Sequence, residues 1–362
     1  AIKPLTYLAA FENGWTPATL IWDVPSEFPP SNDPYDTNPP YKPVNYDNKF
    51  HGPVTVRTAL ANSYNIPAVK TLQAVGIYDN PDTPRPDGLI SMAKRLGISP
   101  LVRTDYGLSL TLGGGEVTPL ELTAAYAVIA NGGMKLPTAA ILKIQTFDGK
   151  TVYEYQPPAG EQVLRAEHAF LISSILSDNE ARTPMFGANS VLNLPFTAAV
   201  KTGTTNDFRD NWAVGYTPDL AAGVWIGNPD NAPMTGTTGV SGAAPIWSEF
   251  MVGAIQQMTG GTPAPFVPPP GIVQKLICAA TGAEPGKYCA TTRSEYFVSD
   301  QPPLTADQDL WRDTWIDTFT GLRASAACAD YMEQALTISV RDPDARLWLV
   351  ADPSGREWAK LQ

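Results

Sequence analysis

The sequence has few of the residues from which protein metal sites are built. Its 362 residues include only two histidines, His51 and His168, and three cysteines. The histidines lie in unrelated segments, and three scattered thiols do not make a zinc site without them. We therefore expect no metal site in this chain.

The cysteines allow at most one disulfide. Cys278 and Cys289 are close in the sequence, whereas Cys328 stands apart. In an oxidising compartment the close pair could join and close a short loop, which would stabilise the fold by about 3 kcal/mol. Two ordinary thiols are the alternative, and the spacing leaves both open.

Basic charge and long apolar runs are also scarce. Lys and Arg number 25 against 36 Asp and Glu, so the net charge is −11. Such a field repels polyanions, which disfavours nucleic acid as a partner and adsorption to an anionic membrane. No apolar run approaches the roughly 18 residues that span a bilayer, and no signal segment opens the chain.

The remaining composition is that of a globular protein with more than one domain. Hydrophobic residues make up 43% and charged residues 17% of the chain. A chain of 362 residues exceeds one ordinary core, so two domains are expected. A Pro/Gly-rich linker over 261–271 is expected to separate a larger domain, 1–260, from a C-terminal region, 272–362.

Hydrophobic periodicity predicts an α/β (α+β) fold in which helices flank an antiparallel sheet. The predicted helices are 2–11, 55–63, 89–96, 120–130, 166–176 and 246–258. The predicted strands are 197–205, 212–216 and 220–226, with a hairpin over 141–155 and short β-like runs after 271. Asn65-Ile66-Pro67 is expected to break the second helix, and 24–53 to form a long loop.

Aromatic residues are concentrated in and before the long loop. Two interpretations stay open: they could line a peptide-binding cleft, or they could pack within the loop. The residues are Trp15, Trp22, Tyr35, Tyr41 and Tyr46.

Three separated segments carry the chemistry: Lys3 in the first helix, the triplet Ser63-Tyr64-Asn65, and Lys201-Thr202-Gly203-Thr204 on a predicted strand. A lysine that is desolvated and close to other cations loses affinity for its proton and can act as a base. Gly203 removes a side chain from the strand, so that a substrate can lie against its backbone. A serine three residues before Lys3 would share its helical face.

The text around these segments resembles the transpeptidase domain of bifunctional class A penicillin-binding proteins, of the serine penicillin-binding protein/β-lactamase superfamily. The resemblance covers residues 1–260 and implies the fold of that superfamily. It is carried by Asn45-Tyr46-Asp47, His51-Gly52-Pro53-Val54-Thr55, Arg57 through Val69, Leu112 through Glu121, Lys201 through Asp219 and Ala244-Pro245-Ile246-Trp247.

The resemblance implies roles for the residues of the motifs. Lys3 would activate a serine nucleophile, Ser63 would relay a proton to the leaving amine, and Asn65 would bind the donor peptide. Lys201 would supply positive potential next to Gly203. Thr202 and Thr204 would bind a terminal D-Ala carboxylate, and the Thr204 N–H would form half of an oxyanion hole.

The family motif reads Ser-x-x-Lys, so the resemblance places the nucleophilic serine immediately before Ala1 and makes the chain N-terminally truncated. It implies a D,D-transpeptidase that cross-links peptidoglycan stem peptides, is acylated by β-lactams and uses no metal or organic cofactor. An upstream glycosyltransferase domain and a membrane anchor would lie outside this chain, on the extracytoplasmic face of the membrane.

Two other functions remain open from the sequence. A serine β-lactamase would need a glutamate in a deacylation loop, and Glu116 and Glu180 stand in the wrong context. A catalytically inactive peptidoglycan-binding scaffold is the other, although retention of all the motif residues argues against it.

Overall fold

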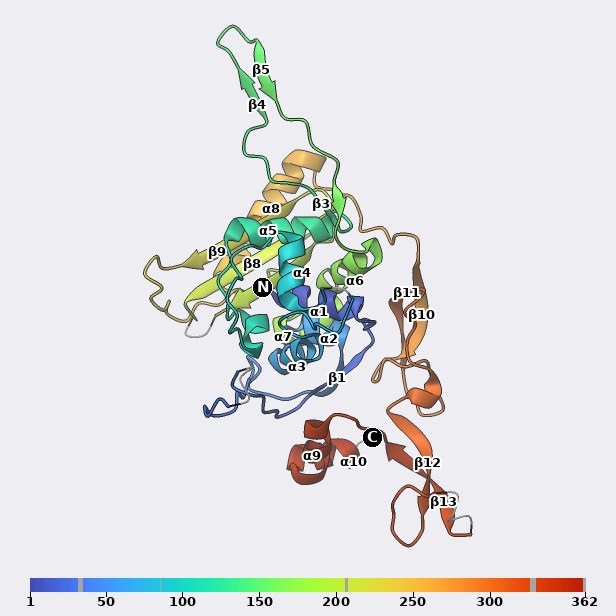
Figure 1. The fold of residues 1–362 in the computed structure, drawn as a ribbon. Coiled ribbons are helices and arrows are strands. Elements are labelled where there is room, and N and C mark those ends of the chain that lie inside the picture. Colours follow the sequence, from blue (N-terminus) through green and yellow to red (C-terminus); the bar gives the residue numbers. More distant parts are fainter. Residues whose placement is uncertain (32–34, 85, 206–207, 326–329, 361–362) are drawn as a thin grey trace.

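A computed structural model describes residues 1–31, 35–84, 86–205, 208–325 and 330–360. The larger part of the structure, from α1 to the end of α8 at Thr259, combines helices with a three-stranded antiparallel sheet in the order β7-β8-β9 (Figure 1). These strands are β7 (Ala199–Thr204), β8 (Asp210–Tyr216) and β9 (Ala221–Gly227). The three predicted strands and their antiparallel arrangement are confirmed.

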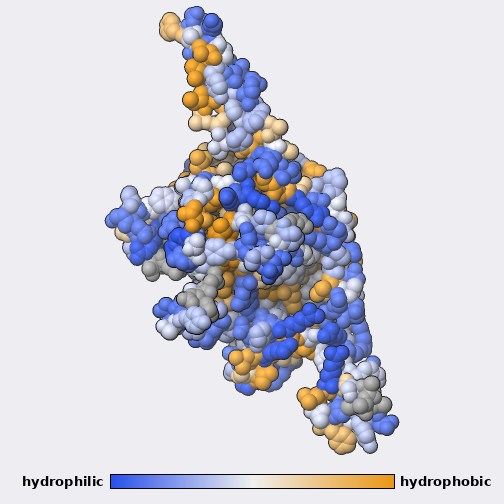
Figure 2. All heavy atoms as spheres, viewed as in Figure 1, coloured by the Kyte–Doolittle hydropathy of each residue, from blue (hydrophilic) through white to orange (hydrophobic). Residues whose placement is uncertain are grey.

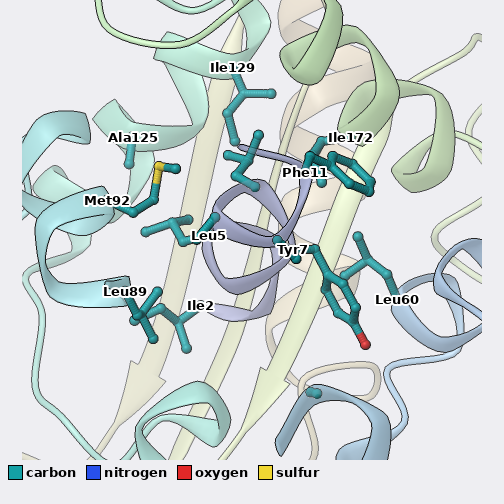
Figure 3. Packing of buried hydrophobic residues seen from close by; sticks show 14 of the residues in the cluster. Ile2, Leu5, Tyr7, Phe11, Leu60, Leu89, Met92, Ala125, Ile129 and Ile172 are labelled. Atoms are coloured by element: carbon teal, nitrogen blue, oxygen red, sulfur yellow. The ribbon is translucent and has the colours of Figure 1, made fainter. Parts of the chain in front are cut away.

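Helix α1 (Lys3–Glu12) lies at the centre of the helical part. Every residue from Lys3 to Phe11 is buried, because the helix is apolar nearly all round. Figure 3 shows Leu5, Tyr7 and Phe11 pointing to different neighbouring helices. Pro4 lies in the first turn, where its missing N–H has no intrahelical partner to lose.

The sheet is covered by helices that the periodicity predicts. The long helix α8 (Ala243–Thr259) packs on it through Trp247, whose ring leaves no room for a Cβ at Gly215. Further helices of the larger part are α4 (Leu89–Leu96), α5 (Pro119–Ala130), α6 (Ala166–Leu176), α7 (Asn179–Phe186) and the 3₁₀ helix η1 (Leu108–Leu112). Of these, α7 and η1 were not predicted.

The segment around the polar triplet differs from the prediction. A short sheet pairs β1 (Leu20–Asp23) with β2 (Gly52–Thr55), and only Val56–Ala61 forms helix α2. A second helix, α3 (Asn65–Val75), begins where a break was predicted. The predicted end of the helix before Asn65 is confirmed, but the new helix was not predicted. Pro67 falls in the first turn of α3, where proline costs no intrahelical hydrogen bond.

A hairpin projects from the larger part (Figure 1). It joins β4 (Lys143–Gln145) to β5 (Thr151–Glu154), as the sequence predicts, and stands beyond the small sheet of β3 (Met134–Lys135) and β6 (Glu161–Gln162). Apolar side chains are exposed along it, including Ile144, Phe147 and Val152. Figure 2 shows hydrophobic patches in orange on this hairpin, at the top of the view.

The described residues of the C-terminal region form two hairpins and two helices. The hairpins are β10 (Ile272–Cys278) with β11 (Thr292–Val298), and β12 (Trp311–Asp317) with β13 (Met332–Ile338). A 3₁₀ turn, η3 (Ala306–Gln308), lies between them, and α9 (Pro343–Ala351) and α10 (Pro353–Lys360) follow. The predicted β-rich region is thus confirmed, but its helices were not predicted.

The C-terminal region is attached to the motif-bearing part by aromatic packing. Trp22 of β1 packs against Trp348 and Trp358 of the last two helices. Trp22 thus neither packs within the loop nor lines a cleft, because it lies in β1 and packs against helices of the C-terminal region. Cys278 and Cys289 form a disulfide, whereas Cys328 lies outside the described residues. Over the described ranges, no helix combines the length and apolar character that crossing a bilayer requires.

Candidate active site

Lys3 and the triplet are brought together between three elements. Ser63 and Tyr64 lie in the connection from α2 to α3, Asn65 is the first residue of α3, and all three contact Lys3 at the start of α1. Lys3 Nζ lies 2.5 Å from the Ser63 backbone oxygen, 3.1 Å from the Tyr64 oxygen and 2.6 Å from Asn65 Oδ1. The buried amine is thus held by polar atoms from all three residues of the triplet.

The Ser63 hydroxyl stands between two lysine amines. Its Oγ lies 3.3 Å from Lys3 Nζ and 2.6 Å from Lys201 Nζ, and Lys201 also donates to the Thr202 oxygen at 2.9 Å. Ser63 has a φ of 60°, a left-handed conformation that side-chain-bearing residues rarely adopt. This turn directs its hydroxyl to both amines, and strained backbone of this kind is typical of functional sites.

Burial makes both lysines weak bases. Desolvation lowers the pKa of Lys201 to about 7, and the nearby cation Arg182 contributes to the lowering. The pKa of Lys3 is held well below its ordinary value by burial and then by the charge of Lys201, with Asp23 opposing the shift. A lysine with a depressed pKa is available as a neutral amine near neutral pH.

Strand β7 brings the third motif to the start of α1. Lys201 and Thr202 are buried, whereas Gly203 and Thr204 are partly exposed. A Cβ built at Gly203 would lie 2.5 Å from the Ala1 backbone nitrogen. Only glycine allows this approach between the strand and the helix start. Thr204 Oγ1 accepts a bond from the Gly239 N–H at 3.0 Å.

Substituting Gly203 by alanine is expected to push the start of α1 away from β7. Because the clash is with backbone, no side-chain rotation relieves it. We expect acylation by a labelled penicillin to fall about 100-fold in a polypeptide that carries a serine before Ala1. Gly253→Ala in α8 is the matched control, since a Cβ there meets nothing within 4 Å. Equal acylation of both variants would contradict the close-approach argument.

The structure also places three polar residues behind the triplet for which the sequence indicated no role. They are Asp23 at the end of β1, and Asn45 and His51 in the connection before β2. Asn45 accepts a bond from the Asn65 N–H at 2.7 Å, and the His51 ring stacks on Tyr64. Asn45 and His51 belong to the sequence segments that resemble the family. Asp23 does not, and the strand that it ends is too short to give a periodicity signal.

All the residues proposed from the motifs thus lie in one place. Lys3, Ser63, Asn65 and Lys201 make direct polar contacts, and Thr202, Gly203 and Thr204 continue the same strand. Asn206 and Asp207, which belong to the family-like text after the third motif, lie outside the described residues.

Comparison with known proteins agrees with this arrangement. Residues 1–251 match the family model described as penicillin binding protein transpeptidase domain. Residues 268–309 match the model described as penicillin-binding protein 1A, C-terminal domain. Residues 252–267 and 310–362 lie outside these two matches.

Curated relatives and a solved structure extend the similarity over most of the chain. Penicillin-binding protein 2D of Bacillus subtilis (strain 168) is 34% identical over 308 residues, which cover 83% of this chain and 42% of that protein. Penicillin-binding protein 1A of Pseudomonas aeruginosa is 30% identical, covering 84% of this chain and 41% of that protein. The crystal structure of penicillin-binding protein 1A from Haemophilus influenzae matches 84% of this chain and 48% of that one, with a TM-score of 0.70 and 27% identity.

The chain therefore spans less than half the length of these relatives. The match to the transpeptidase model nevertheless covers more than half of this chain and includes every residue of the site. The chain belongs to the family of penicillin-binding protein transpeptidase domains, of the type found in penicillin-binding protein 1A.

Proposed function

We propose that this chain is the catalytic part of a D,D-transpeptidase, which cross-links peptidoglycan stem peptides through a serine acyl-enzyme and is acylated by β-lactams. The observation that carries the proposal is the Ser63 hydroxyl between the buried amines of Lys3 and Lys201, at 3.3 and 2.6 Å. A neutral Lys3 amine and the Ser63 hydroxyl form a proton-transfer chain that needs no histidine, and the charged Lys201 amine lies on the other side of the hydroxyl.

In this mechanism the nucleophile is a serine immediately before Ala1. Lys3, three residues later at the first position of α1, takes the proton of its hydroxyl as the oxygen attacks the carbonyl of the penultimate D-Ala. The proton then passes through the Ser63 hydroxyl to the nitrogen of the terminal D-Ala, which leaves as the C–N bond breaks. The amine of a second stem peptide attacks the resulting ester, loses a proton by the reverse route and releases the serine.

Strand β7 suits the binding of an extended peptide. It is an edge of the β7-β8-β9 sheet, and an edge strand offers unpaired backbone groups to a ligand. Thr202 and Thr204 would bind the terminal carboxylate with their hydroxyls, while Lys201 supplies positive potential. The N–H groups of Thr204 and of the serine would stabilise the oxyanion, and the N-terminal end of α1 adds partial positive charge there.

We place this activity on the extracytoplasmic side of a membrane, in a longer protein with a glycosyltransferase domain and an anchor. The disulfide between Cys278 and Cys289 supports this placement, because such bonds persist in oxidising compartments. We also propose residues 1–260 as the transpeptidase domain, 261–271 as a linker and 272–362 as an accessory region.

The two alternatives have less support. A β-lactamase needs a glutamate that activates a deacylating water, and both Glu116 and Glu180 are exposed side chains. An inactive scaffold would have no use for two buried lysines, because burying an ammonium group lowers the stability of the fold.

The proposal is tested with a polypeptide in which a serine precedes Ala1. It is incubated with a labelled penicillin, and the adduct is followed by intact mass. A stable 1:1 adduct, blocked by replacing that serine with alanine, is expected. Rapid turnover of the drug would indicate a β-lactamase, and no adduct at all would indicate a scaffold.

The pH dependence of acylation follows from the two lysines. The mechanism needs Lys3 neutral and Lys201 charged, so acylation should fall as the pH rises through the Lys201 pKa of about 7. Arg182→Gln removes a cation that lowers this pKa, and the alkaline limb should move to higher pH. An alkaline limb that stays in place in Arg182→Gln would contradict the assignment to Lys201.

A further inference from the structure

Asp23 is a wholly buried carboxylate behind the site, at the end of β1. One of its neighbours is Asn45, whose Nδ2 donates to both carboxylate oxygens at 2.9 and 2.7 Å. The other is His51, whose backbone N–H donates at 3.2 Å and whose Nδ1 lies 2.5 Å from Oδ2. A buried charge that is this fully bonded fixes the orientation of the groups around it.

The first of these neighbours acts on Asn65. Because its amide nitrogen faces Asp23, Asn45 must turn its Oδ1 toward the N–H of Asn65, 2.7 Å away. That N–H opens helix α3, whose N-cap residue Tyr64 provides no side-chain cap. Asn45 therefore caps α3 from another part of the chain, and does so at the residue whose Oδ1 holds Lys3.

The second neighbour acts on Tyr64. The His51 ring stacks on the Tyr64 ring, with centroids 4.0 Å apart and planes inclined by 15°. Tyr64 is the middle residue of the triplet, and its backbone oxygen accepts from Lys3 at 3.1 Å. The other ring nitrogen of His51, Nε2, lies 3.1 Å from Asp47 Oδ2.

We infer that Asp23 is a positioning residue for the reaction of the proposed function, acting through Asn45 on Asn65 and through His51 on Tyr64. The inference rests on the proposed function for its kinetic consequence. Its structural content, that the Asp23 carboxylate holds the triplet in register with Lys3, stands on the contacts alone.

The state of His51 is part of this device. The groups that face its ring are the Asp23 and Asp47 carboxylates and the Tyr64 ring, and only a protonated ring can donate to both carboxylates. Burial lowers the pKa of His51, but the bonds and charges of Asp23 and Asp47 outweigh burial and raise it. Deprotonation leaves one ring nitrogen with a lone pair facing a carboxylate, and the triplet loses part of its support.

The experiment compares Asp23→Asn with an exchange of the pair, Asp23→Asn combined with Asn45→Asp, in the polypeptide that has a serine before Ala1. In the single variant, the new side-chain amide of residue 23 places an N–H donor where a carboxylate oxygen accepted from Asn45 Nδ2. With that hydrogen bond lost, the acylation rate constant should fall about 10- to 100-fold. The exchange restores one donor and one acceptor between the two positions, and about tenfold of the rate should return. Folding of each variant is checked by thermal melting.

The pH profile separates positioning from loss of stability. The ratio of the wild-type rate constant to that of His51→Gln should fall as the pH rises through the His51 pKa, because Lys3 and Lys201 are common to both proteins. His168→Gln, which removes the other histidine of the chain, is the control and should leave the profile unchanged. A folded Asp23→Asn protein with wild-type acylation would overturn the inference.

A measurement without turnover keeps the inference distinct from the proposed function. In NMR spectra of this chain, the His51 Hε1 signal should titrate above the ordinary histidine pKa of about 6.5, and the Tyr64 ring signals should move with it. Asp23→Asn should lower that pKa. If the wild-type protein shows this titration but is not acylated, the proposed function alone is rejected. If the Tyr64 signals do not change as His51 titrates, the inference alone is rejected.

Discussion

Replacing Lys3 by methionine is expected to lower the rate of acylation by a labelled penicillin at least about 1,000-fold, in a polypeptide with serine before Ala1. The methionine has a similar volume but neither takes a proton nor donates to the triplet. The Ser63 hydroxyl keeps its contact with Lys201 but loses the amine that links it to the nucleophile. Stopped-flow acylation, with intact mass as the end point, measures the effect.

Lys3→Arg distinguishes a base from a fixed cation. Arginine keeps the charge and the donors but does not lose its proton near neutral pH. If Lys3 is the base, Lys3→Arg should fail almost as completely as Lys3→Met. Acylation within about tenfold of wild type in Lys3→Arg would show that positive charge, not proton transfer, is what this position supplies. Lys143→Met, on the projecting hairpin, is the control for loss of an exposed lysine.

The four catalytic candidates could be predicted because each lies in a short motif whose chemistry is local. That the three motifs meet follows from the family resemblance, but the backbone geometry could not be predicted: Lys3 and Lys201 reach the Ser63 hydroxyl through a left-handed turn at Ser63. Nothing about a serine in sequence signals a positive φ. The positioning residues Asp23 and Asn45 were missed because their contacts are not local. Asp23 bonds Asn45, 22 residues later, and Asn45 bonds Asn65, 20 residues later.

The fold could be predicted where local signals agree. Helix Leu89–Leu96 was predicted over its full length, because its amphipathic pattern ends at Gly97 in a left-handed cap. Helix α9 was missed, although Asp342 followed by Pro343 is a start signal, and Asp342 caps the helix with its side chain. The apolar, β-like composition of the C-terminal region outweighed that signal.

The largest effect on stability is expected from Glu295→Ala. Glu295 of β11 holds Arg57 of α2 in a bidentate pair, with Nε–Oε2 at 2.7 Å and Nη2–Oε1 at 2.6 Å. The exposed fractions of the two side chains are 7% for Arg57 and 1% for Glu295. No local pattern predicts a contact across 238 residues, yet it ties the C-terminal region to the helix that leads into Ser63.

Removing Glu295 leaves the buried guanidinium of Arg57 with the partly exposed Asp178 as its remaining acidic partner among the described ion pairs. It also removes the carboxylate that lies 3.5 Å from Arg293. Breaking a buried pair in this way costs about 3–5 kcal/mol, so the melting temperature should fall by at least about 5 °C. Asp300→Ala is the matched control, because its pair with Arg165 is exposed and should contribute little. Calorimetry of both variants measures the difference.

The double variant Arg57→Met/Glu295→Met decides whether the orphaned charge is the cause. If it is, the double variant should recover most of the melting temperature lost in Glu295→Ala, because two well-packed apolar side chains replace a buried pair at little cost. A double variant as unstable as the single one would instead place the loss in the lost pair of Glu295 with Arg293 or in the packing of β11 against α6. In either case, acylation should fall together with stability, because α2 ends two residues before Ser63.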